Sequence, residues 1–149
     1  SLGTPPHQPK DVFRLALTLI EDLWVVSKRL KKTCSVEESD GVSGKVPKDV
    51  YELAFDLLGQ IHILATKFNL DVYEGLARPQ KNPGPIKPAD VLDLMNIVLA
   101  DVGAIKAVLA VTAPTVIAPA QPAKVPSNVF SAVKSADGLV RCLLETRQR

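Results

Sequence analysis

The chain has 149 residues, of which 46% are hydrophobic and 23% are charged, and its formal net charge is +2 at pH 7. A chain of this length can bury a sizeable core, and so apolar a composition excludes general disorder. The near-neutral charge favours neither nucleic acid nor a membrane surface as a partner, and no charge-free apolar run reaches the roughly 18 residues of a membrane span.

One short phrase, Pro-x-[Asp/Asn]-Val followed by Phe, Tyr or Leu, occurs four times. The copies begin at Pro9, Pro47, Pro88 and Pro126. Proline has no backbone N–H to lose in the first helical turn, and an acidic residue two places later suits the positive end of the helix dipole. Each copy therefore predicts the start of a helix. A recognition motif for a partner is the alternative interpretation.

The first predicted helix covers residues 9–32. Its apolar residues recur at steps of three and four, which places them on one face. Trp24, the one tryptophan, lies at the edge of this stripe, where it suits the core, a ligand pocket or an interface. The helix ends in a basic cluster that is expected to complement the helix dipole, with a phosphate-binding patch as the alternative. The cluster consists of Lys28, Arg29, Lys31 and Lys32.

A polar connection leads to a second predicted helix over residues 47–68, which could continue to Ala77. This helix carries His62, and the other histidine, His7, lies in a predicted flexible lead-in over residues 1–8. No ligand cluster, Glu-x-x-His motif, haem motif or phosphate-binding loop is present, so we predict no metal, no cofactor and no enzyme. A nucleophilic pair of Cys142 with His62 is the remaining catalytic alternative, and it lacks an evident orienting group.

A proline-rich connection precedes a third predicted helix over residues 88–112, which is more apolar than one buried face requires. The polar residues expected to break its surface are Asp93, Asn96, Asp101 and Lys106. The next connection, residues 113–125, is unusually apolar too. We predict a partner-binding surface on this helix and connection. Its candidate residues are Ile97, Ala100, Ala104, Ala107, Val108, Val111, Val116 and Ile117.

Three arrangements could cover these apolar side chains. The connection could fold back over the third helix with Val116 and Ile117 turned inward, which is the preferred expectation. A second copy of the protein could dock there, or another partner or an apolar ligand could bind.

The fourth predicted helix covers residues 126–147. Pro9 and Pro88 are 79 residues apart, and so are Pro47 and Pro126. This common offset predicts two duplicated helical hairpins related by an approximate twofold axis. The predicted fold class is all-α, a four-helix up-and-down bundle forming one domain over residues 9–149. Its predicted core includes Val12, Val50, Val91 and Val129.

In an up-and-down bundle, Cys34 after the first helix and Cys142 in the fourth lie at opposite poles. They are then about 30 Å apart, whereas a disulfide needs Cα atoms within about 7 Å. The prediction is therefore two unpaired cysteines, and a disulfide would imply crossover connections.

These features predict a non-catalytic helical-bundle interaction module. It would bind a protein partner or itself through the third helix and the connection after it, without nucleic acid or a membrane span. The alternative is a sensory or carrier bundle that holds a small apolar ligand between its helices. The long Pro/Ala-rich connections and the small number of cysteines favour an exported, for instance periplasmic, bacterial protein.

Overall fold

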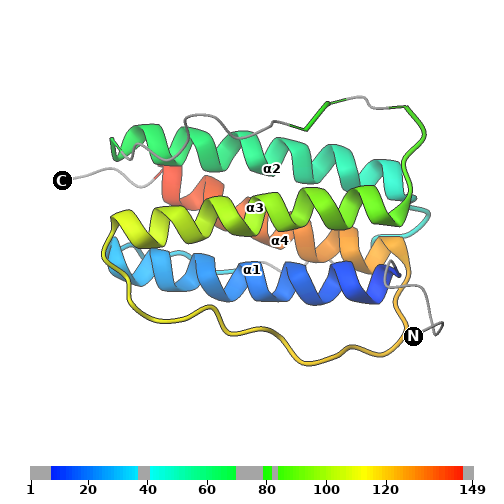
Figure 1. Cartoon of the computed structure of the whole chain (residues 1–149), viewed down its shortest axis with the longest axis horizontal. Coiled ribbons are helices and arrows are strands. Elements are labelled where there is room, and N and C mark those ends of the chain that lie inside the picture. Colours follow the sequence, from blue (N-terminus) through cyan, green and yellow to red (C-terminus); the bar gives the residue numbers. More distant parts are fainter. Residues whose placement is uncertain (1–7, 37–40, 70–78, 82–83, 146–149) are drawn as a thin grey trace.

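The computed structural model describes residues 8–36, 41–69, 79–81 and 84–145. It contains α1 (Pro9–Arg29), α2 (Pro47–Lys67), α3 (Pro88–Val108) and α4 (Pro126–Glu145) (Figure 1). These residues include no β-strand, so the all-α fold class is confirmed. No described helix is long and apolar enough to cross a bilayer. Residues 1–7 of the predicted lead-in, residues 70–77 of the possible extension of the second helix, and the predicted end of the fourth helix after residue 145 lie outside the described part.

Every helix begins at the proline that the repeated phrase predicts. The side chain two residues after the proline accepts a hydrogen bond from the backbone N–H of the residue before the proline. That N–H would otherwise have no partner at the helix end. The acceptors are Asp11, Asp49, Asp90 and Asn128, at N···O distances of 3.1, 2.9, 2.8 and 3.0 Å. The phrase therefore acts as a capping device.

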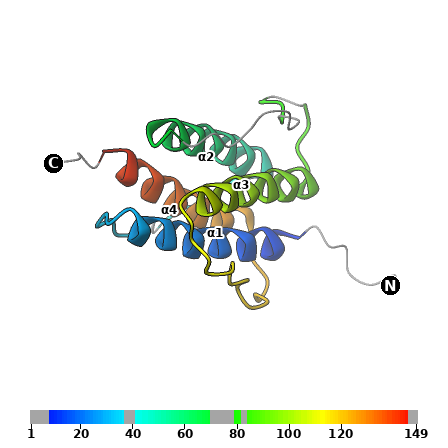
Figure 2. The ribbon, with the colours of Figure 1, turned by 60° about the vertical axis from the view of Figure 1, so that its left-hand side comes forward.

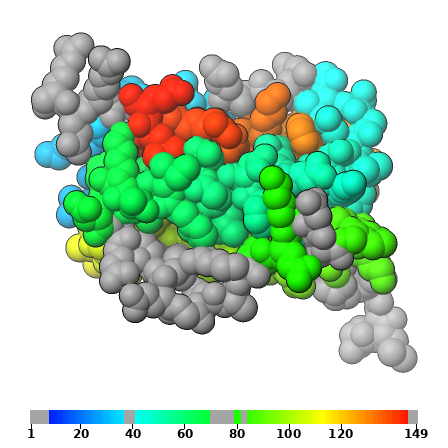
Figure 3. All heavy atoms as spheres, turned by 90° about the horizontal axis from the view of Figure 1, so that it is seen from above, coloured from blue at the N-terminus to red at the C-terminus, as the bar shows by residue number. Residues whose placement is uncertain are grey.

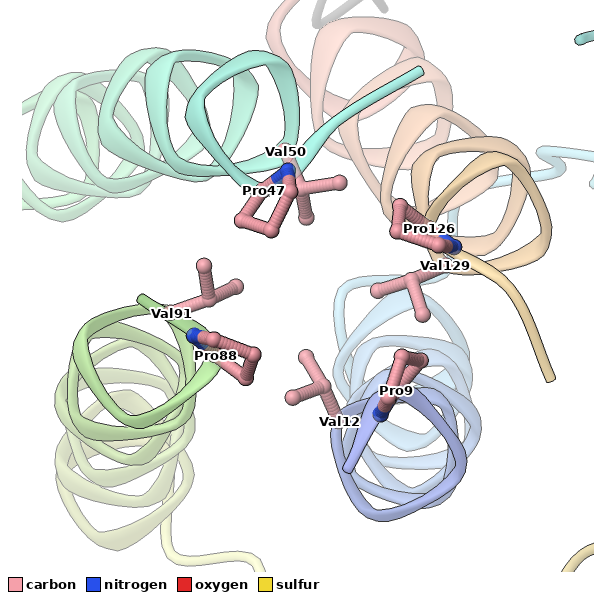
Figure 4. Close-up of a pocket in the computed structure, with 8 residues that line it drawn as sticks. All are labelled: Pro9, Val12, Pro47, Val50, Pro88, Val91, Pro126 and Val129. Atoms are coloured by element: carbon pink, nitrogen blue, oxygen red, sulfur yellow. The ribbon is translucent and has the colours of Figure 1, made fainter. Parts of the chain in front are cut away.

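All four helices point in the same direction. Their four N-terminal prolines and the valines three residues later surround one apolar pocket at one pole of the bundle (Figure 4). The predicted up-and-down arrangement is therefore corrected to a parallel one. The valines are buried, as predicted, and the core continues along the bundle axis.

The helices do not pair in chain order. Both α1 and α2 pack against α3 and α4, so α1 and α2 lie on a diagonal and form no hairpin. Figure 3 shows α2 beside α4 on one face of the molecule.

Long connections make the parallel arrangement possible. A 21-residue helix is about 30 Å long, a distance that about nine extended residues can span. Residues 30–46, 68–87 and 109–125 each exceed that minimum, so each can return from the C-terminal to the N-terminal pole. The sequence permits both directions because none of its connections is short enough to force an antiparallel neighbour.

At the opposite pole, basic side chains cap neighbouring helices. Arg29 Nε of α1 donates to the backbone oxygen of Leu109 after α3 (2.8 Å), and Lys67 Nζ of α2 donates to that of Leu144 in α4 (2.7 Å). Parallel helices bring like dipole ends together, so such caps reduce the repulsion there. Basic side chains at a helix C-terminus, expected to complement the dipole of their own helix, here bond to the C-terminal end of the adjacent helix.

Candidate functional site

The predicted partner-binding residues of α3 lie on its outer side. Ala100, Ala107 and Val108 are exposed, whereas Ile97 and Ala104 are half-buried, as is Val111, which follows the helix. Val108 keeps 51% of its surface exposed. The apolar excess of α3 is therefore only partly covered.

The connection 109–125, called loop 3 below, does not fold over α3 as expected. It runs along α1, on the side of the bundle away from α2 (Figures 1 and 2). Val116 and Ile117 face solvent, with 68% and 66% of their surfaces exposed. The expected inward turn of these two side chains is wrong, because α1 binds the polar groups on either side of them.

Four hydrogen bonds fix loop 3 around this exposed pair. Before the pair, Thr115 Oγ1 donates to Asp22 Oδ2 (2.8 Å) and accepts from Lys106 Nζ (3.3 Å). After the pair, the Ala118 N–H donates to Thr18 Oγ1 (3.0 Å), and Arg14 Nε donates to the Ala118 carbonyl. Val116 and Ile117 therefore lie between two anchored residues.

Thr115, the anchored residue before the exposed pair, bonds to both members of a buried ion pair. Lys106 Nζ of α3 lies 2.8 Å from Asp22 Oδ1 of α1, and the two residues are only 5% and 2% exposed. Buried charges are costly unless they are paired and hydrogen-bonded, and here Thr115 supplies the additional bonds. Sequence reasoning placed Lys106 on the surface, which is wrong, and did not select Asp22.

A second acidic residue is buried in the seam between α2 and α3. Asp101, only 1% exposed, places Oδ2 2.6 Å from His62 Nε2. The expectation that Asp101 interrupts a surface is therefore wrong. Asp22 and Asp101 are 79 residues apart, so the internal repeat held a signal for both buried carboxylates.

His62 therefore has the orienting carboxylate that the sequence did not reveal. The hydroxyl of Thr66 donates to the backbone oxygen of His62 (3.0 Å). Cys142 is in a disulfide and cannot act as a nucleophile. No group of three metal-ligating side chains occurs within the described ranges.

The two cysteines form a disulfide, which corrects the prediction of free thiols. Cys34 and Cys142 have Cα atoms 5.9 Å apart and are separated by 108 residues in sequence. The parallel arrangement explains the pairing, because it brings the C-terminal ends of α1 and α4 to the same pole. The crossover connections that a disulfide would imply are therefore present.

Two further side chains, Tyr51 and Arg141, have raised pKa values. The Tyr51 hydroxyl donates to the Gln80 carbonyl (2.6 Å), and burial, aided by the negative charge of Asp90, raises the pKa of Tyr51. On α4, the hydrogen bond and charge of Asp137 raise the pKa of Arg141 above its already high value. Neither group gains a charge state suited to catalysis near neutral pH.

An open groove lies between α1 and α4. Phe13, Leu17, Ile20 and Trp24 line its α1 side, and its volume is about 460 Å³. Trp24 is 40% exposed, so it lies on the rim as predicted for an edge position. The apolar pocket among the helix N-termini is much smaller, about 20 Å³, which suits no more than one water-sized group.

Comparison with known proteins found no matching family model, no matching curated protein and no matching solved structure. Function must therefore be inferred from the residues of this chain.

Proposed function

We propose that the protein is a non-catalytic interaction module that binds a protein partner through apolar side chains of loop 3, with the outer side of α3 as a second contact. The exposure of Val116 and Ile117 carries this proposal, because two large aliphatic side chains face water although anchors hold the backbone beside them. Burying them against a partner would contribute about 1.5–3 kcal/mol for each side chain.

The rest of the molecule supports a presenting role. The packed core and the disulfide hold four helices as a support for loop 3. Disulfides persist in oxidising compartments, so the pair Cys34–Cys142 favours an exported protein. Duplication of a two-helix unit remains part of the proposal. Because α1 neighbours α3 and α2 neighbours α4, the copies would be related by a quarter turn about the bundle axis (Figure 4).

The experiment is affinity capture from extracts of the organism that makes the protein, followed by binding assays with each captured protein after purification. The Val116→Ser/Ile117→Ser variant should lose at least tenfold in affinity. Val125→Ser should bind normally, because Val125 is exposed on the same connection but lies beyond the anchors. Ala107→Glu tests the outer side of α3. A partner that binds all these variants equally well would contradict the proposal.

A second candidate function is binding of a small apolar ligand, and the α1–α4 groove favours it. The packed core and the 20 Å³ apolar pocket at the N-terminal pole leave little room between the helices, so the groove is the better location. A ligand there should shift Trp24 fluorescence and raise the melting temperature by mass action. A panel of fatty acids and hydrophobic dyes that changes neither property would exclude this function.

A further inference from the structure

The backbone of loop 3 is extended where it carries the exposed pair. Residues 111–125 form no helix, turn or bend, and Pro114 and Pro119 stand on either side of Val116 and Ile117. Proline fixes its own φ and disfavours a helical conformation in the residue before it, so both ends of this short segment are kept extended. Loop 3 also forms an outer edge of the molecule in two views (Figures 1 and 2).

The polar backbone groups of this segment have no partners within the molecule. In the described part of the protein, no backbone N–H or carbonyl of residues 112–117 takes part in a hydrogen bond. An extended segment with unpaired backbone groups can pair with an extended segment of another protein, as an added β-strand does. Loop 3 therefore offers main-chain hydrogen bonds as well as two exposed aliphatic side chains.

Anchors hold the chain on both sides of the Ile117–Ala118 peptide bond. Before this bond, Thr115 is fixed through its hydroxyl. After it, the Ala118 N–H donates to Thr18 Oγ1 of α1 (3.0 Å), and the Ala118 carbonyl accepts from Arg14 Nε. Both backbone groups of Ala118 are thus bound to a helix of the disulfide-linked bundle. A segment fixed in this way loses little conformational entropy when it binds.

An endopeptidase binds the chain that it cleaves in an extended form, and a specificity pocket receives the side chain before the scissile bond. In serine endopeptidases this pocket is small and apolar in elastase, a larger apolar slot in chymotrypsin and acidic in trypsin. Residues 111–123 contain no charged residue, so loop 3 does not suit the acidic pocket. Ile117, a β-branched aliphatic residue that is 66% exposed, suits the small apolar one.

We propose that the partner of loop 3 is a serine endopeptidase with a small apolar specificity pocket, which the protein inhibits. Ile117 enters the pocket, and the Ile117–Ala118 bond lies at the catalytic serine of the enzyme. This inference rests on the proposed function, because it names the class of protein that loop 3 binds. Such complexes ordinarily form with little backbone movement, which agrees with a segment that is already extended and anchored.

The anchors on Ala118 favour inhibition over digestion. When the catalytic serine attacks the Ile117 carbonyl, the bond to Ala118 breaks, and the Ala118 nitrogen gains the proton that the serine has lost. In an ordinary substrate this amine diffuses away. Here Thr18 and Arg14 hold Ala118 beside the acyl group, so the amine can attack the ester, restore the peptide bond and release the serine with its proton.

Hydrolysis of small chromogenic peptides by elastase, chymotrypsin and trypsin, each titrated with the purified chain, tests the proposal. The wild type should inhibit elastase with an inhibition constant of about 1 μM or lower, and trypsin at least about a hundredfold more weakly. Ile117→Lys should reverse this preference, because lysine fits the acidic pocket of trypsin and not the apolar pocket of elastase. Val125→Lys, a change on the same connection beyond the anchors, is the matched control and should behave like the wild type.

A second variant tests the anchors. Thr18→Val keeps the shape of the side chain but removes the oxygen that accepts from the Ala118 N–H. Elastase should then cleave the Ile117–Ala118 bond at least about tenfold faster than in the wild type, and inhibition should fade as the chain is consumed. Mass spectrometry of timed samples locates and quantifies the cleavage, while circular dichroism and melting temperature verify that every variant is folded.

Wild-type protein that leaves elastase fully active, or that elastase cleaves as fast as Thr18→Val, would overturn this inference. Ile117→Lys without effect on trypsin would overturn it too, because Ile117 would then not occupy the pocket. The proposed function would remain if Val116→Ser/Ile117→Ser still loses a captured partner that is not a peptidase. It fails separately if the captured partner binds that variant as well as it binds the wild type.

Discussion

Whether a single residue in this bundle is buried depends on which helix lies beside it. Lys106 is the clearest case, because a lysine in the last turn of a helix is ordinarily exposed, yet here it meets Asp22 of α1 (2.8 Å) in the interior. No local pattern around Lys106 identifies α1 as the neighbour. Its burial could not be predicted from the sequence before the order of the helices was known.

Lys106→Met should lower the free energy of unfolding by about 3–5 kcal/mol, because it leaves the carboxylate of Asp22 buried without a counter-charge. Urea unfolding of wild type and variant measures the loss. The double variant Asp22→Leu/Lys106→Met is the control, and it should recover most of the stability because no charge remains to be buried. A single variant that loses less than about 1 kcal/mol would show that the pair is effectively solvated.

Helix starts could be predicted to the residue, because each depends on local chemistry. The proline at the first position and the acceptor two places later act within one turn, whatever the rest of the fold does. The ends of the first and third helices, predicted at residues 32 and 112, lie at Arg29 and Val108. Lys31 and Ala110, which follow α1 and α3, adopt φ values of 57° and 58°, and neither is the glycine that would have marked the end.

Ala110→Gly should therefore stabilise the protein. Ala110 occupies the left-handed position of a C-terminal motif in which the Val111 N–H bonds to the Lys106 carbonyl (2.8 Å). Relief of backbone strain outweighs the extra freedom of glycine in the unfolded chain, so we expect a gain of about 0.5–1 kcal/mol. The melting temperature should rise by about 1–4 °C. Ala107→Gly, in the last turn of the same helix, is the control and should have the opposite effect.

At the scale of the whole molecule, the sequence specified four helices and a common core but not the direction of the helices. Apolar faces pack equally well in parallel and antiparallel bundles, and long connections permit both. The cysteines held the missing information, because a bond between Cys34 and Cys142 requires the C-terminal ends of α1 and α4 to lie together. The candidate surface could likewise be predicted only as an apolar excess. The structure shows two separate candidate surfaces, loop 3 and the α1–α4 groove, and their separation depends on how loop 3 is anchored to α1.

The disulfide should be a major source of stability in this arrangement. It closes a loop of 108 residues, and restricting so long a loop in the unfolded chain stabilises the folded state by about 4–5 kcal/mol in the chain-entropy description. Because measured values are often smaller, we expect Cys34→Ser/Cys142→Ser to lose about 2–5 kcal/mol in urea unfolding. The wild type unfolded in the presence of a thiol reductant should show the same loss, whereas the double variant should not respond to the reductant. If removal of the bond left the stability unchanged, the unfolded chain would already hold the ends of α1 and α4 close together, since the cross-link would then restrict no additional freedom.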